Sequence, residues 1–357
     1  MNSIIGRVVF YPILIINILS IGLLLLSAYS PHFYPEDYPY LAISGLLFSI
    51  FLAVNICFVV VWIFVRWKYV FIILVAFLLC YPQIRMCIPI HFQTKKIPKD
   101  SFKVLSYNVM RFGNLKKTHD KNSILAYLKK EDADILCMQE YDVSCDKNYL
   151  TQKDVEKDLS AYPYQRIMQR QLACYSKYPI LSARFLDCKS NYNGAAFFEL
   201  KIGKDMVTII NCHLESNKLT KEDKTVYEDM LKSPQTDKVK KGTRQLAAKL
   251  ADASIIRASQ AQIITGEIRA SHHSNVIVCG DFNDTSISYT HHVISQSLND
   301  AFTETGLGLG VSYNMNRFYF RIDHILISRN MKVYNCIVDH SIKDSDHYPI
   351  KCYITKQ

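Results

Sequence analysis

The chain has 357 residues, with 42 lysines and arginines against 32 aspartates and glutamates and a formal net charge of +10. This length leaves room for more than one domain. Residues 1–99 hold 7 basic and 2 acidic residues, so the remainder has 35 basic and 30 acidic residues and a net charge of only +5. Nucleic-acid binding by charge alone needs concentrated lysine and arginine. The charge therefore argues against a purely electrostatic nucleic-acid-binding domain.

The first 90 or so residues contain long apolar stretches, and charged residues become dense only from Lys95 onward. Residues 8–29 and 38–65 contain no charged residue, and both stretches exceed the roughly 18 to 20 residues that cross a bilayer. A third candidate is uncharged only up to Arg85. We expect a transmembrane region at 1–92 with three helices at about 8–29, 40–65 and 69–90, a linker at 93–100 and a soluble domain at 101–357.

Two alternatives to three spans stay open. The third segment could be a re-entrant or interfacial helix, because Arg85 would have to reach the lipid headgroups for the segment to span. The first segment could be a cleaved signal peptide, although the apolar segment that follows it at once suits an anchor better.

The basic residues of the short loops predict the orientation in the membrane. Arg7 precedes the first span, and Arg66 and Lys68 lie between the second and third, whereas the loop at 31–39 has two acidic residues and no basic one. Since basic loops stay in the cytoplasm, we expect a cytoplasmic N-terminus and an extracytoplasmic soluble domain. The three lysines that follow the last span argue weakly for the opposite orientation.

The 11 cysteines form no metal-binding pattern, since no Cys-x-x-Cys pair or cysteine and histidine zinc spacing occurs. Cys137, Cys212 and Cys279 lie in apolar runs, where cysteine packs as a small hydrophobic residue. A structural zinc site has little support, and disulfide pairing among the other cysteines is left open.

From residue 101 onward, apolar runs alternate with amphipathic segments, which predicts an α/β fold. The expected elements, in chain order, are strands at 102–107 and 135–138 on either side of a helix at 123–130, a hairpin-like group at 172–176, 195–202 and 207–213, a helix at 243–268, and strands at 276–279, 322–327 and 348–353. Two stacked sheets flanked by helices fit this order best.

Polar residues occur where these strands are expected to end. They are Asn108 in SYNV, Glu140 in MQEY, His213 in NCHLE, Asp281 and Asn283 in GDFND, Asp323 in RIDHI, and Asp346 with His347 in SDHYP. Uncompensated carboxylates near a core are costly, so these side chains need a shared reason to lie there. A hard divalent cation and a phosphate supply one, because Mg²⁺ prefers oxygen ligands.

Chemical roles follow from residue type and position. Glu140 would emerge at the rim of a sheet and coordinate Mg²⁺. Gly280 permits a sharp turn, and we expect Asp281 and Asn283 to point to the same side of an extended segment. Asp281 could then accept a proton from an attacking water, while Asn283 could hold a phosphate oxygen or the nucleophile. Taken alone, Glu140 fits a surface salt bridge and GDFND fits an ordinary turn.

The C-terminal Asp346 and His347 are adjacent, so in an extended segment they face opposite sides. Asp323 is therefore the better partner to orient His347, which leaves Asp346 to face the metal. For His213 alone, a hydrogen-bonded core histidine is the plainer interpretation.

Taken together and in this order, the motifs resemble the endonuclease/exonuclease/phosphatase superfamily, to which deoxyribonuclease I belongs. The matching segments are SYNV, QE, YSKYPI, NCHLES, GDFN, RIDHI and SDHYP, and the resemblance covers residues 100–357. It implies a four-layer α/β sandwich of the deoxyribonuclease I type, with two packed mixed sheets flanked by helices. It also implies Mg²⁺-dependent hydrolysis of a phosphate ester by in-line attack of water, with Mn²⁺ as an alternative metal.

The resemblance also implies a role for each matched residue. The expected metal ligands are Glu140, Asn108 and Asp346; the expected phosphate-binding residues are Asn108, Asn283, His213 and His347; and the expected catalytic residues are Asp281, Asn283, His213, His347 and Asp323. Within this set, Asp281 would orient or deprotonate the water, and Asp323 would orient His347.

The substrate is left open by the sequence. The segments VCGDFN and FRIDH lack the tryptophan and the Cys-Asp-Arg-Ile run usual in inositol polyphosphate 5-phosphatases, which counts against inositol phosphates. A phosphodiesterase acting on phospholipid and a nuclease acting on external nucleic acid both fit a membrane-anchored enzyme. A catalytically inactive, membrane-tethered scaffold is the alternative, although the intact polar sites argue against it. No protein partner can be inferred.

Overall fold

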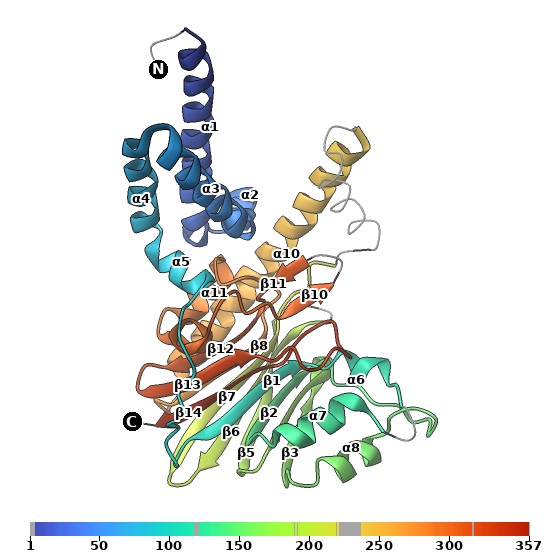
Figure 1. Cartoon of the computed structure of the whole chain (residues 1–357). Helices are drawn as coiled ribbons and strands as arrows, with labels where there is room; N and C mark the ends of the chain where they lie inside the picture. Colours follow the sequence, from blue (N-terminus) through green and yellow to red (C-terminus); the bar gives the residue numbers. More distant parts are fainter. Residues whose placement is uncertain are drawn as a thin grey trace.

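The computed structural model describes residues 4–117, 121–188, 190, 192–218, 220, 237–315 and 318–356 (Figure 1). Its body contains two six-stranded mixed sheets. In spatial order, the first sheet has β13 (Met331–Val338), β14 (Ile350–Lys356), β1 (Phe102–Asn108), β2 (Ile135–Gln139), β4 (Leu172–Ser176) and β3 (Tyr164–Met168). The second has β5 (Ile180–Leu186), β6 (Gly194–Ile202), β7 (Asp205–His213), β8 (Val276–Asp281), β12 (Asp323–Ser328) and β9 (Leu298–Asp300). A small hairpin is formed by β10 (Tyr313–Met315) and β11 (Phe318–Phe320).

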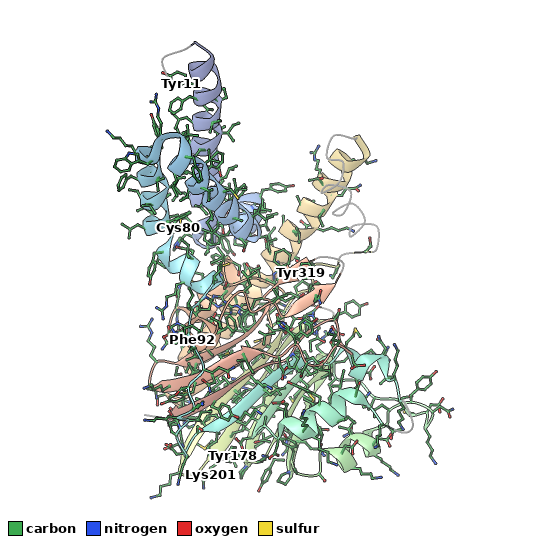
Figure 2. The ribbon with its side chains drawn as sticks, in the orientation of Figure 1. Tyr11, Cys80, Phe92, Tyr178, Lys201 and Tyr319 are labelled. Carbon is green, nitrogen blue, oxygen red and sulfur yellow. The ribbon has the colours of Figure 1, made fainter. Side chains whose placement is uncertain are left out.

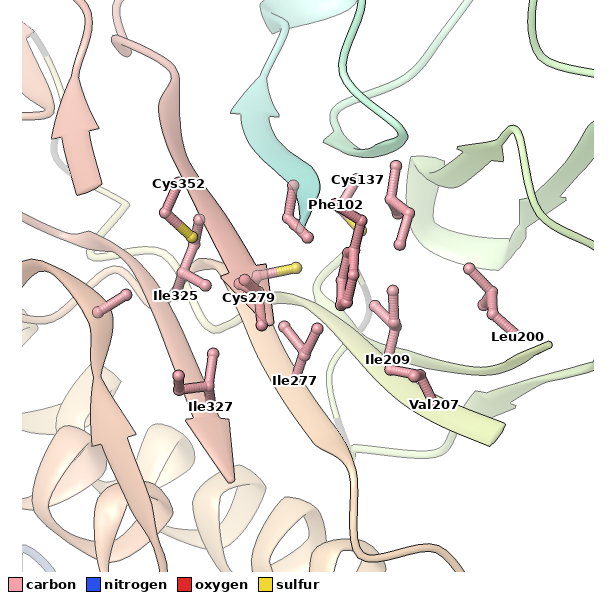
Figure 3. Packing of buried hydrophobic residues seen from close by; sticks show 14 of the residues in the cluster. Phe102, Cys137, Leu200, Val207, Ile209, Ile277, Cys279, Ile325, Ile327 and Cys352 are labelled. Atoms are coloured by element: carbon pink, nitrogen blue, oxygen red, sulfur yellow. The ribbon is translucent and has the colours of Figure 1, made fainter. Parts of the chain in front are cut away.

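The main core lies between the two sheets, where alternate strand residues face each other (Figure 3). Ile209, Ile277 and Ile325 come from neighbouring strands of the second sheet, and they share this core with Cys137 and Cys352 of the first. The cysteines among the described residues are free thiols, and those in this core act as small apolar side chains.

Helices cover the outer faces of both sheets. On the first sheet lie α7 (Ser123–Glu131) and α8 (Gln152–Asp158), and on the second lie α10 (Asp237–Ala270) and α11 (Tyr289–Ser295). Short helices α6 (Met110–Asn114) and α12 (Ala301–Thr305) complete the body. This arrangement of helix, sheet, sheet and helix confirms the predicted four-layer α/β sandwich.

Most of the expected helices and strands are present, with small shifts at their ends. The prediction that the strands at 172–176, 195–202 and 207–213 form one hairpin-like group is wrong. β6 and β7 do form an antiparallel hairpin in the second sheet. In contrast, β4 pairs with β2 and β3 in the first sheet. An apolar run identifies a buried strand but not the sheet that it joins, and the exposed pattern of β5, which opens the second sheet, gave no apolar signal.

The N-terminal region is a separate group of helices that projects from the body (Figure 1). It comprises α1 (Ile4–Ala28), the 3-10 helix η1 (Ser30–His32), α2 (Pro39–Ala42), η2 (Ile43–Leu47), α3 (Phe48–Arg66), η3 (Trp67–Tyr69), α4 (Val70–Leu79) and α5 (Tyr81–Cys87). Tyr11 lies near the far end of this region, and Cys80 lies close to the body (Figure 2). Two helical stretches, Phe10–Ala28 and Pro39–Leu79, are long and apolar enough to cross a membrane by length and composition.

The helical region is attached to the body by close packing and by polar contacts. A Cβ on Gly45 would lie 2.0 Å from the carbonyl oxygen of Ile287, so only glycine permits this approach. The Arg85 guanidinium lies 2.9 Å from the Glu304 carboxylate, and Arg321 donates a 2.8 Å hydrogen bond to the carbonyl of Met86. These contacts hold α2, η2 and α5 against the second sheet's helices and the loops beside them.

A buried asparagine joins the two sheets. Asn211 of β7 donates hydrogen bonds to the carbonyls of Met138 and Ala173 in the first sheet, at 3.0 and 3.1 Å. Its side-chain oxygen accepts a 2.6 Å hydrogen bond from the amide of Gln139. Because Asn211 is fully buried, these three bonds compensate for its desolvation and fix the position of one sheet against the other.

Replacement of Asn211 by leucine removes all three bonds without leaving a cavity of matching size. We expect Asn211→Leu to lower the free energy of unfolding by about 2 to 4 kcal/mol, because buried polar groups of β2 and β4 lose their partner. Urea unfolding of the full chain in detergent, followed by circular dichroism, measures this. The control Asn148→Leu lies on an exposed loop and should change stability by less than about 0.5 kcal/mol. Equal effects of both variants would contradict the assignment.

Candidate active site

Strand pairing brings the sequence-predicted residues of the second sheet into one row. His213 is paired with Asp281 between the parallel strands β7 and β8, and Asp281 is paired with Asp323 between β8 and β12. The first sheet contributes from the facing side, where Asn108 at the end of β1 is paired with Gln139, the residue before Glu140. The two sheets thus bring their polar ends to the same edge of the sandwich.

Glu140, Asn108 and Asp281 are linked across the two sheets. The Asn108 amide donates to Glu140 Oε1 at 3.0 Å and to Asp281 Oδ2 at 3.2 Å. Glu140 follows the last residue of β2 and has a left-handed backbone with φ of 52°, so its side chain does not continue the alternation of the strand. Burial is the main cause that raises the pKa of Glu140, and it outweighs the hydrogen bond from Asn108, which acts in the opposite direction.

His347 lies between two buried carboxylates. Its Nδ1 is 2.8 Å from Asp323 Oδ2, the pairing that the sequence favours, and its Nε2 is 3.5 Å from Asp281 Oδ2. Burial alone would lower the pKa of His347, but the charges of Asp323 and Asp281 outweigh it and raise the pKa to about 10. Without a bound cation, His347 is therefore an imidazolium at neutral pH, and it donates rather than accepts protons.

His213 differs from His347 in its charge. Its Nε2 lies 3.8 Å from both Glu140 Oε1 and Asp281 Oδ2, outside hydrogen-bond distance. Burial lowers the pKa of His213, and the nearby His347 cation acts in the same direction. His213 is thus the neutral imidazole of the site.

The prediction that Asp281 and Asn283 lie in one extended segment is wrong. Asn283 has a left-handed backbone with φ of 51°, and its N–H donates a 2.8 Å hydrogen bond to Asp281 Oδ1. Its side-chain amide donates to the carbonyl of Leu214 at 3.0 Å. The two residues are neighbours because a tight side-chain turn follows β8, a local bond that strand periodicity does not reveal.

Asp346 lies half-buried at the mouth of the site, on the loop before β14. Its backbone carbonyl accepts a hydrogen bond from Asn314 at 3.1 Å, and the neighbouring Ser345 hydroxyl donates to the carbonyl of Asn108 at 2.7 Å. These bonds hold the Asp346 loop against β1.

Sequence reasoning missed three residues that line the same cavity. The ring centroid of Tyr313 lies 5.1 Å from that of His347, Arg170 lies in the 3-10 helix η4 (Gln169–Gln171), and Tyr192 lies in the segment before β6. None of them stands in a motif or directly after a predicted strand, so the sequence gave no signal for them. The cavity has a volume of about 1060 Å³.

The donor chemistry of the site fits a hard divalent cation. Glu140 and Asp346 offer carboxylate oxygens at the cavity, and the buried Asn108 amide is hydrogen-bonded to Glu140. Asp281, Asp323 and His347 form a further group whose ligand atoms lie within 4.8 Å of one another. Since His347 is already held by Asp323, the oxygen-rich mouth is the better place for Mg²⁺ or Mn²⁺.

A second acidic and histidine group, made of His291, Asp300 and His324, does not suit a metal. Arg321 Nη1 donates to Asp300 Oδ2 at 3.0 Å and lies 3.1 Å from His324 Nδ1. The guanidinium therefore supplies the positive charge that a metal would bring.

Comparison with known families agrees with this geometry. The model of the Endonuclease/Exonuclease/phosphatase family matches residues 105–347, which is more than half of the chain, and the chain belongs to this family. Membership suggests a metal-dependent phosphoesterase or nuclease. A second family model, described as a domain of unknown function, matches residues 7–87. No curated protein matches the chain.

Solved structures show the same fold at low sequence identity. The human Nocturnin catalytic domain with a bound sulfate anion has a TM-score of 0.51 at 14% identity, over 73% of this chain and 96% of that one. D. rerio TDP2 complexed with a single-strand DNA product has a TM-score of 0.50 at 13% identity, over 72% and 99%. An endonuclease/exonuclease/phosphatase from Bacteroides vulgatus has a TM-score of 0.50 at 15% identity, over 72% and 99%.

Gly280 sets the position of Asp281, and a side chain at this position should disturb the site. It has φ of 132°, and a Cβ would lie 2.0 Å from the carbonyl oxygen of Cys212 on β7. We expect Gly280→Ala to destabilise the full chain by at least about 2 kcal/mol, because two backbones would have to separate. Gly266→Ala is the control, since a Cβ there meets nothing within 4 Å on α10. Denaturant unfolding should show unchanged or slightly higher stability for Gly266→Ala, by up to about 1 kcal/mol.

Proposed function

We propose that the protein is a membrane-anchored, divalent-metal-dependent phosphoesterase that hydrolyses a phosphodiester by in-line attack of water. The observation that carries the proposal is the convergence of Glu140, Asp281, His213 and His347 from two sheets on one cavity. The group combines anionic oxygen donors, a neutral imidazole and an imidazolium, which suits the positioning and charge stabilisation that phosphoryl chemistry needs.

In this proposal, Glu140, Asp346 and Asn108 would hold Mg²⁺ or Mn²⁺, which when bound would supply positive charge beside the phosphate. Asp281 orients the water and takes its proton, which the raised pKa of this buried carboxylate favours. His347, protonated and held by Asp323, donates toward the phosphate oxygens or the leaving oxygen. The water oxygen forms the new bond to phosphorus, and the P–O bond to the leaving alcohol breaks.

His213 and Asn283 complete the phosphate-binding side of the site in this proposal. His213 is neutral and donates through one ring nitrogen, and Asn283 lines the cavity beside Asp281. The deoxyribonuclease I-like fold holds a sulfate anion in human Nocturnin and a DNA product in D. rerio TDP2. The proposal at this level covers two substrate classes, external nucleic acid and phospholipid headgroups.

Exposure supports membrane anchoring by the N-terminal helices. Large apolar side chains project all round them, including Ile16, Leu19, Phe64 and Leu78 with exposed fractions of 57%, 63%, 84% and 74%. Water would disfavour such a surface, whereas lipid would cover it.

The packing of the loops supports the proposed orientation. The segment between α1 and α3 contacts α10 and α11 of the catalytic body, whereas Arg66 and Lys68 lie at the opposite end of α3. With a cytoplasmic N-terminus, the acidic loop and the catalytic domain share the extracytoplasmic side. The third membrane segment of the proposal is α4, whereas α5 beyond Cys80 packs against the catalytic body through Arg85 and Met86.

Two substitutions test the chemistry. Glu140→Gln should raise the Mg²⁺ concentration for half-maximal activity by about ten-fold or more, because a charged ligand is lost. Asp281→Asn should lower kcat by about 10² or more at saturating Mg²⁺, because the proton acceptor is lost. Hydrolysis of a chromogenic phosphodiester by the full chain in detergent measures both.

The control for both is Glu156→Gln on the exposed face of α8, which should keep wild-type activity and metal dependence. Wild-type rates in Asp281→Asn would show that the water lies elsewhere. A folded wild-type protein that binds neither Mg²⁺ nor Mn²⁺ and hydrolyses nothing would favour the inactive scaffold instead.

The proposed orientation can be tested with a native thiol. Cys145 is exposed on the catalytic body. A membrane-impermeant maleimide should label it in intact cells that express the protein, and Cys145→Ser should abolish that labelling. Labelling that appears only after the cells are permeabilised would place the catalytic domain in the cytoplasm and overturn the orientation.

A further inference from the structure

The catalytic cavity has two chemically different ends. One end holds the charged and polar side chains of the proposed active site, including Glu140, Asp281 and His347. The other end is apolar and is lined from two directions. The N-terminal region contributes Ile43, Leu46, Leu47 and Ile50, and α10 contributes Leu246 and Leu250. We call these six residues the apolar wall.

The apolar wall leads from the active site to the apolar helices. Leu47 is the last residue of η2, and Ile50 lies in the first turn of α3, the apolar helix that ends at Arg66. Leu47 and Ile50 have exposed fractions of 45% and 51%, so neither is covered by the protein itself. A ligand that spans the cavity would therefore have one end at the active site and the other at the membrane surface.

The position of the wall is fixed by packing. Gly45 lies against the carbonyl of Ile287 at a distance that excludes any Cβ, and Phe48 and Leu52 of α3 pack with Ile287 in one buried cluster. The N-terminal region thus forms part of the substrate cavity in addition to any anchoring role.

We propose that the substrate is a phosphoester that carries a long hydrocarbon chain. Its phosphate binds at the active site, and its chain lies along the apolar wall toward α3. This inference rests on the proposed phosphoesterase function and narrows its substrate to a lipid-linked phosphoester. Burial of hydrocarbon against the apolar wall provides the binding energy, while the polar end selects the phosphate.

The charges in the cavity disfavour nucleic acid as the occupant. A nucleic-acid strand carries a phosphate on every nucleotide and is bound along a basic track. Apart from the active-site histidines, the basic side chains among the described residues that line the cavity are Arg170 and Lys218, and Lys218 is paired with Glu215 at 2.6 Å. Tyr40 and Tyr192 could stack on bases, but the apolar wall offers no cation for the neighbouring phosphates.

A matched pair of chromogenic substrates tests the inference on the full chain in detergent with Mg²⁺. Hexadecyl 4-nitrophenyl phosphate and methyl 4-nitrophenyl phosphate share the leaving group and differ only in the alkyl chain. In both, water attacks phosphorus, the P–O bond to 4-nitrophenolate breaks, and an alkyl phosphate is left. We expect kcat/KM to be at least ten-fold higher for the hexadecyl ester.

Filling the apolar end should remove this preference. Ala247 lines the cavity on α10, whereas the adjacent Ala248 does not. Ala247→Trp should lower kcat/KM for the hexadecyl ester at least ten-fold and leave the methyl ester within two-fold, and Ala248→Trp should resemble wild type in the same micelles. Leu47→Asp changes an exposed residue and should act like Ala247→Trp even if the tryptophan variant does not fold.

A binding measurement separates this inference from the proposed function. A hexadecyl phosphodiester with a diazirine at the chain end, irradiated with chelator present, should cross-link to residues 40–50 and 243–250, and Ala247→Trp should prevent this. Cross-linking without hydrolysis of either ester would overturn the phosphoesterase proposal but keep the chain site. Equal hydrolysis of both esters without cross-linking, or efficient cleavage of an oligonucleotide without any alkyl preference, would overturn the lipid inference alone.

Discussion

The site depends on how the two sheets are held against each other, and Asn211 is the polar contact that does this inside the apolar core. It lies two residues before His213 on β7, and its partner Gln139 directly precedes Glu140 on β2. The same bonds that satisfy a buried amide therefore set the distance between side chains from different sheets. An apolar residue at this position would bury as much surface but would not specify a register, because the hydrophobic effect is not directional.

Two buried groups of aspartate and histidine in this chain show how charge distinguishes a structural cluster from a functional one. Around Asp300, burial acts to raise the pKa, but the Arg321 guanidinium together with His291 and His324 holds the pKa of the carboxyl well below its usual range. Around Asp281, burial and the neighbouring Asp323 raise the pKa, and the charge that opposes them is the imidazolium of His347. The first group is neutralised by its own chain. The second has an excess of carboxylates beside a cavity, which is the condition that a divalent cation and a phosphate would complete.

Much of this arrangement could be predicted from the sequence, because strand ends and residue types are local signals. The pairing of Asp323 with His347 followed from the alternation of side chains, and the strand positions of Asn108 and His213 followed from apolar runs. Asn283 could not be placed correctly, because its left-handed backbone depends on a hydrogen bond to Asp281 rather than on periodicity. Neither could Tyr313 or the sheet assignment of β4, since both are decided by which distant segments pack together.

The largest departure from the sequence-based view concerns the N-terminal helices, which the sequence presents only as an anchor. An anchor needs length and hydrophobicity but no fitted contact with the domain it holds. Here the lack of a side chain on Gly45 permits its close approach to the Ile287 carbonyl, and the buried Arg321 donates a hydrogen bond to the carbonyl of Met86 near the end of α5. Contacts of this kind position η2 beside the active-site cavity, which a flexible tether would not do. If the substrate were a soluble polymer, the apolar wall would only obstruct its approach. For the proposed lipid substrate, whose headgroup leaves the bilayer before its hydrocarbon chain, the apolar wall replaces the lipid contacts that the chain loses. The fixed attachment is thus what the proposed role of the helices in substrate binding requires.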